Sequence, residues 1–146
     1  MASLLEDLRR RVAMALARCV VAAVNDGAKL QGLQIKLLAG EAKDGVERFQ
    51  QYGLTAHPHP GAEGVAVFVG GNRDHGLVLA VDDRRYRLRG LAQGEVALYD
   101  DQGQKVHLTR DGIVIEAKAL TVNADGDITL AAGGDVTITG SNINLN

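Results

Sequence analysis

The sequence predicts a mainly β protein with three parts: a short N-terminal helix, a small closed β-barrel, and a C-terminal β-helix in which three chains intertwine. Composition supports this class, because hydrophobic residues make up 46% of the 146 residues whereas aromatic residues make up only 3%. Such aliphatic sequences are typical of sheets and solenoids. The strongest observation is an internal repeat of paired apolar residues within residues 111–146.

The N-terminal part, residues 1–17, predicts a helix over residues 3–17. Its apolar residues recur at helical spacing, and they are Leu4, Leu5, Leu8, Val12 and Leu16. Ser3 is a candidate N-cap, and Glu6 stands three residues later, as in a capping box. Charged residues interrupt the apolar pattern, which excludes a signal peptide or a membrane span here.

Residues 18–92 predict an OB-like barrel of about five strands. The first two candidate strands flank Asn25-Asp26-Gly27, which favours a hairpin, and Leu33, Ile35 and Leu37 alternate as one buried face. Further strand candidates are 47–52, 65–69 and 77–81. Residues 93–110 are expected to form a connecting hairpin from the strand candidates 95–99 and 105–109.

Residues 111–146 are expected to form a needle. Apolar-x-apolar pairs recur with first members 7, 8, 8 and 7 residues apart, and small or turn-forming residues lie between them. Each repeat therefore predicts one short strand with two inward residues. The predicted axis residues are Ile113, Ile115, Leu120, Val122, Ile128, Leu130, Val136, Ile138, Ile143 and Leu145.

Burial predicts that this needle is a homotrimer. A single chain winding its own three-sided coil would complete fewer than two turns with five repeats, too few to cover its apolar face. Three chains winding around one axis place the paired residues in a dry centre. They also remove the exposed strand edges.

Four segments carry a resemblance to a known family: 38–41, 48–54, 70–88 and 94–103. They resemble the baseplate spike proteins of Mu-like phages, in the baseplate assembly protein V group. The resemblance implies an OB-fold platform on a hub ring and a trimeric needle that plugs the tail tube. It also implies a virion protein, made in the host cytoplasm, that touches the outer membrane as the sheath contracts.

Needles of this family often end in a His-x-His pair that binds iron between three chains. The present sequence has no histidine after His107, so we expect no such site in it. The last polar residues near Leu145 are Asn142, Asn144 and Asn146, and amides are poor metal ligands. We therefore expect a separate tip protein to contact this end, with an asparagine ladder as the alternative.

Residues that could carry chemistry have structural interpretations, so we expect no enzyme activity, cofactor or metal. His57-Pro58-His59-Pro60 has no third ligand nearby in the sequence. Asp74-His75 lies in the 70–76 turn without a marked nucleophile, and there Arg73 and Asp74 are expected to pair at the barrel rim or across the trimer. The run 82–85 is expected to form intersubunit ion pairs, and Cys19 to be a buried, inert thiol.

Two other function classes share parts of this sequence pattern. A single-strand nucleic-acid binder needs aromatic platforms and a basic groove, but the chain has two Phe, three Tyr and no Trp. Residues 111–146 are also acidic, with five Asp or Glu and one Lys, which argues against a polyanion ligand there. A type VI secretion-like spike would share the architecture, although such spikes are larger fusions.

Overall fold

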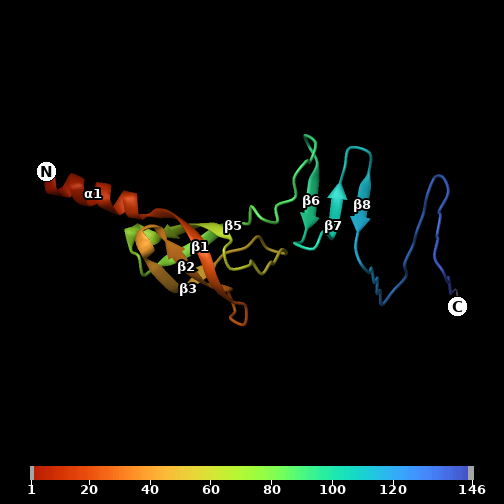
Figure 1. Cartoon of the computed structure of the whole chain (residues 1–146), viewed down its shortest axis with the longest axis horizontal. Helices are drawn as coiled ribbons and strands as arrows, with labels where there is room; N and C mark the ends of the chain where they lie inside the picture. The colour runs from red at the N-terminus through yellow and green to blue at the C-terminus, as the bar shows by residue number, and fades with distance from the viewer. Residues whose placement is uncertain (1, 145–146) are drawn as a thin grey trace.

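A computed structural model describes residues 2–144 of the chain. Figure 1 shows the parts strung along one long axis: helix α1 at one end, then a β-barrel, then a small sheet, then an extended C-terminal segment. The structure confirms a mainly β chain with a short N-terminal helix and a closed five-stranded barrel.

Helix α1 spans Ala2–Met14, which is shorter than predicted. Leu16 fits the helical pattern, but it begins strand β1 instead, opposite Val67 of the barrel. The predicted N-cap Ser3 lies inside the helix. Asp7 pairs with Arg10 at 2.6 Å and with Arg11 at 3.0 Å on one helical face, as expected for residues one turn apart.

The C-terminal end of α1 is held against the barrel. The backbone N–H of Phe68 donates to the Ala15 carbonyl at 2.8 Å. Gly71, in the short helical turn Val69–Gly71, has φ +75, and a Cβ there would lie 2.7 Å from the Arg11 carbonyl oxygen. Both the conformation and the close approach therefore require glycine at this position.

The predicted first hairpin is present. Strand β1 (Leu16–Asn25) pairs antiparallel with β2 (Gly32–Leu37). The connection is longer than a tight turn, and Gln31 is buried within it. The side-chain amide nitrogen of Gln31 donates to Asp26 at 2.5 Å, and Arg48 donates to the side-chain oxygen Oε1 of Gln31 at 2.8 Å. These bonds satisfy a polar side chain that would be costly to bury alone.

Strand β3 was placed wrongly by the sequence prediction of 47–52. It spans Ala42–Arg48, after the short helical turn Leu38–Gly40, and its segment AKDGVER buries only Val46. The tertiary pairing with β2 creates this strand, in spite of its weak apolar pattern.

Two further strands close the barrel. Strands β4 (Glu63–Phe68) and β5 (Gly76–Asp82) match the predicted segments and pair antiparallel with each other. The barrel closes where β3 and β5 run parallel, in the order β1-β2-β3-β5-β4. Closure leaves no open sheet edge in the barrel.

The hydrophobic core lies inside this barrel. As predicted, the alternating residues of β2 are buried in it. The largest fully buried side chains come from four of the five strands, and they are Phe68, Leu33, Ile35, Val21 and Val78. Cys19 is also in this cluster. The small core is therefore mainly aliphatic, with Phe68 as its one large aromatic residue.

A second, three-stranded antiparallel sheet follows the barrel. Strands β6 (Val96–Tyr99) and β7 (Lys105–Leu108) form the predicted hairpin. A third strand, β8 (Ile113–Glu116), pairs with β7. The first apolar pair of the repeat is therefore also the outer strand of this sheet.

The rest of the repeat has no regular secondary structure over residues 117–144. Figure 1 shows it running back and forth across the long axis, in the same direction as the strands of the small sheet. The intertwined trimeric β-helix therefore stays a prediction. Leu145 and Asn146 lie outside the described residues.

Candidate functional site

The candidate functional surface is the row of predicted axis residues. The nine of them within the described residues are 51 to 74% exposed. Asn142 and Asn144 are exposed as well. Nothing in a single chain covers these apolar pairs, so the surface fits association with other chains better than chemistry within one chain.

The small sheet carries a related surface that the sequence analysis missed. Residues directly opposite each other in antiparallel strands share a face. The register therefore places six aliphatic residues on one face of the sheet, in two rows: Val96, Leu108 and Ile113, then Leu98, Val106 and Ile115. We call this set the apolar sheet face.

The opposite face of the sheet is mixed, and it carries Ala97, Tyr99 and Val114 beside the paired residues Lys105, His107 and Glu116. Lys105 bonds Glu116 at 3.1 Å, and His107 lies 3.2 Å from Glu95. A backbone hydrogen bond from Ala92 lowers the pKa of the Glu95 carboxyl, and the His107 ring adds to this effect. One face of the sheet is therefore entirely aliphatic, and the other is mixed, with its charged groups paired.

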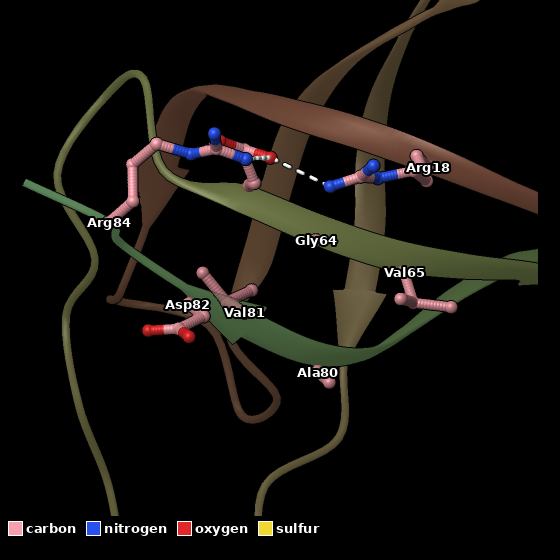
Figure 2. A pocket seen from close by; sticks show the side chains of 8 residues that line it. Arg18, Gly64, Val65, Ala80, Val81, Asp82 and Arg84 are labelled. Atoms are coloured by element: carbon pink, nitrogen blue, oxygen red, sulfur yellow. Dashed lines mark hydrogen bonds and ion pairs between the residues drawn. The ribbon is translucent and has the colours of Figure 1, made fainter. Parts of the chain in front are cut away.

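An ion-pair cluster lies on the outside of the barrel, beside a groove of about 240 Å³ formed by β1, β4 and β5. Figure 2 shows the Arg18 and Arg84 guanidinium groups converging on one carboxylate. That carboxylate is Glu63, which accepts from Arg18 at 3.0 Å and from Arg84 at 2.8 Å. Hydrogen bonding by Arg84 is the main cause that lowers the pKa of Glu63.

This cluster predicts a pH-dependent contribution to stability. The folded-state pKa of Glu63 lies below its ordinary value of 4.5, so the stabilisation is complete above that value and is lost as the pH falls through the folded pKa. We expect Glu63→Gln to lower the urea midpoint at neutral pH. The difference from the native chain should shrink toward zero in acid.

Arg84→Gln removes the principal partner of Glu63 and serves as the matched variant. It should show the same direction of pH dependence, because it leaves Glu63 with Arg18 alone. A Glu63→Gln midpoint difference that stayed constant from neutral to acidic pH would contradict a stabilising role for the ionised carboxylate.

The charged run 82–85 has partners within its own chain, and the predicted ion pairs between subunits stay a prediction. Arg84 reaches Glu63, and the Arg85 guanidinium donates to Asp83 at 2.6 Å. The Arg85 hydrogen bond lowers the pKa of Asp83. The turn after β5 brings Asp83 and Arg85 together.

The turn 70–76 is part of the barrel rim, as expected, but Arg73 and Asp74 have separate partners. Lys43 donates to Asp74 at 2.9 Å, and this hydrogen bond lowers the pKa of Asp74. The Arg73 guanidinium lies 4.6 Å from the centre of the Phe68 ring. The carboxylate of the Asp74-His75 pair is therefore hydrogen-bonded to Lys43.

His59 joins the barrel to the small sheet. Its Nε2 atom lies 3.0 Å from the Asp101 carboxylate, in the turn between β6 and β7, and its ring is 5.1 Å from that of Tyr86. Within residues 2–144, no group of three His, Cys, Asp or Glu side chains is arranged to hold a metal ion.

Cys19 is buried, as predicted, and is 3% exposed. Burial raises the pKa of its thiol, which disfavours the reactive thiolate. Its sulfur lies beside Gly64, where an added Cβ would be 3.1 Å from the sulfur and 2.9 Å from the Ala80 carbonyl oxygen. The thiol thus fills space in the core.

No helix within the described part of the chain is long and apolar enough to cross a membrane.

Comparison with known proteins shows that the chain is similar to members of one family. A family profile described as the N-terminal part of Bacteriophage Mu Gp45 matches residues 18–85. The chain is 45% identical over 128 residues to the baseplate puncturing device gp45 of Escherichia phage Mu. That match covers 87% of the chain and 65% of the phage protein, so the chain spans just under two thirds of that relative.

A second relative is the Mu-like prophage FluMu protein gp45 of Haemophilus influenzae. It is 37% identical over 123 residues, which cover 84% of the chain and 67% of the relative. Both matches extend beyond the part of this chain that the family profile covers, because 128 and 123 residues are more than the span 18–85.

Proposed function

This chain belongs to the family of Mu-like phage baseplate spike proteins that includes gp45, and on that premise we propose that three copies form the central spike of a contractile tail baseplate. The phage Mu relative is named a baseplate puncturing device. The family supports a structural role in a virion tail, and we propose that the chain has no enzyme activity.

In our proposal the two halves of the chain have different tasks. The closed barrels of three copies form a platform on a ring of hub protein and plug the tail tube. Residues 111–146 of the three copies wind into a needle. The needle punctures the host outer membrane when the sheath contracts.

The observation that carries this proposal is the exposure of the repeat. Each described axis residue is more than half exposed in one chain, although aliphatic side chains at a regular repeat normally line a core. Triplication about one axis buries all of them together. In a monomeric protein this long apolar row would stay exposed to water, which is unfavourable.

The proposal predicts the mass of the native particle. Native mass spectrometry or light scattering should give three times the chain mass of 15.4 kDa. The trimer should persist on dilution to low micromolar concentration, because each chain buries apolar surface along the whole needle. A monomer at these concentrations would defeat the proposed spike.

A further inference from the structure

The sequence contains four Asp-Gly pairs, at residues 26–27, 44–45, 111–112 and 125–126. In such a pair the backbone nitrogen of the glycine can attack the carboxyl group of the aspartate before it, because glycine has no Cβ to hinder the approach. The outcome depends on where the carboxyl group and the N–H group are held. The structure distinguishes the pairs on this point.

Asp44-Gly45 is the pair whose two reacting groups meet. The Gly45 N–H donates to the Asp44 oxygen Oδ1 at 2.9 Å, so the carboxyl group lies against the nitrogen that would attack it. Both residues are exposed. They also line an open groove of about 250 Å³ together with residues of β1 and β2, and this groove admits the water that the reaction needs.

A β-bulge in β3 produces this arrangement. The register between β2 and β3 shifts at Gln34, so Asp44 and Gly45 together lie opposite this one residue. The extra residue of a bulge is left out of the ladder. Gly45 has φ +63, in the left-handed region, and a Cβ there would meet nothing within 4 Å. Its N–H therefore bonds to the neighbouring carboxylate, with open space around it.

The pair at 26–27 has the opposite arrangement. The Asp26 carboxylate accepts from the buried Gln31 side chain at 2.5 Å. The Gly27 N–H donates to the Asn25 side chain at 3.2 Å. Both reacting groups are therefore held by other partners, and each of these hydrogen bonds must break before the two groups can meet.

Two other places have only part of the arrangement. The Gly112 N–H donates to the Thr109 hydroxyl at 3.1 Å, and not to Asp111. The Asp83 N–H donates to Asp82 at 2.8 Å, which is the same contact as at Asp44. However, Asp83 carries a side chain that crowds its nitrogen, whereas glycine carries none.

We propose that Asp44-Gly45 is a site of spontaneous aspartate isomerisation, with water as the only co-reactant. The Gly45 nitrogen attacks the Asp44 carboxyl carbon, a C–N bond forms, and the acid hydroxyl leaves with the amide proton as water. The product is a five-membered succinimide ring. Water then opens the ring. Opening at the side-chain carbonyl restores aspartate, and opening at the main-chain carbonyl gives isoaspartate. The reaction needs no enzyme or partner, so it does not depend on the proposed trimer.

Isoaspartate at this position is expected to weaken the barrel. It adds one carbon atom to the backbone of β3, directly before Val46, which is the one buried residue of that strand. The next residue, Glu47, pairs with Leu77 of β5, where the barrel closes. A longer backbone disturbs the register that places Val46 in the core. The isomerised chain should therefore unfold at a lower urea concentration.

Ageing of the purified full chain in water enriched in heavy oxygen tests the site. The folded chain and a chain held unfolded in guanidinium chloride are incubated side by side at neutral pH, then digested and analysed by liquid chromatography and mass spectrometry. Each passage through the succinimide inserts one heavy oxygen atom. Isoaspartyl and aspartyl peptides have equal mass but separate on the column. Asp44→Glu is the matched control, because its longer side chain keeps the charge but cannot form the five-membered ring.

In the folded chain we expect isoaspartate to accumulate at residue 44 about tenfold faster than at residue 26, the factor that a typical protein hydrogen bond supplies. In the unfolded chain the two rates should be similar. Asp44→Glu should take up no heavy oxygen at residue 44, and the isomerised fraction of the native chain should have a lower urea midpoint. Equal rates at residues 26 and 44 in the folded chain would overturn the proposal. A rate at residue 44 that folding suppresses would overturn it as well.

Discussion

Replacing Ile128 by aspartate is expected to abolish or severely weaken trimer formation. Ile128 is the first member of the middle apolar pair, so three copies would place three carboxylates at one level of the axis. Burying an aliphatic side chain is worth about 1.5–3 kcal/mol, and here the loss is repeated three times. Burial of unpaired charges adds a further penalty. Light scattering should report mostly monomer.

Thr129→Asp is the matched control, because it adds the same charge at the next residue, which the repeat places outward. It should remain a trimer with little change in thermal stability. If Ile128→Asp also stayed a trimer with unchanged thermal stability, Ile128 would not lie at the axis. The needle model of this segment would then be wrong.

Replacing Phe68 by alanine is expected to produce the largest loss of barrel stability. Phe68 is fully buried and is the largest side chain of the core. Removing a buried phenylalanine ring typically costs about 3–5 kcal/mol, from lost transfer free energy and the cavity left behind. The Arg73 guanidinium, which stacks on the ring, would also lose its contact. Urea unfolding followed by circular dichroism would measure the shift.

Phe49→Ala provides the comparison, because it is the same substitution at a half-exposed ring. Its effect on the unfolding midpoint should be several times smaller. Similar midpoints for the two variants would mean that the barrel core does not depend on Phe68, contrary to the packing described.

The barrel was predictable where one face of a strand is buried and the other is not. Leu33, Ile35 and Leu37 alternate in the sequence and are buried in the structure. Strand β3 was misplaced because it contributes one buried residue, Val46, and its other positions are polar or small. The end of α1 was misplaced because Leu16 satisfies both a helical and a strand pattern, and pairing with β4 decides between them.

The candidate surface was only partly predictable. The pairs of the repeat are visible because their spacing is regular, and their exposure in one chain agrees with a surface made for other copies. The apolar sheet face was missed because it depends on the register of three strands. Only that register shows that Val96 and Leu98 lie on the same face as the aliphatic residues of β7 and β8. The contact of His59 with Asp101 joins residues far apart in the chain, and no local pattern indicates it.

That contact between His59 and Asp101 affects how the molecule carries load. The segment between β5 and β6 links the barrel to the sheet covalently and has no regular structure. Alone it would act as a hinge between the two. The contact of His59 with Asp101, 3.0 Å long, adds a second connection beside this segment, since the His59 ring also lies 5.1 Å from that of Tyr86 within it. Bending the sheet away from the barrel on this side would have to break that exposed contact, which by itself resists only a small force.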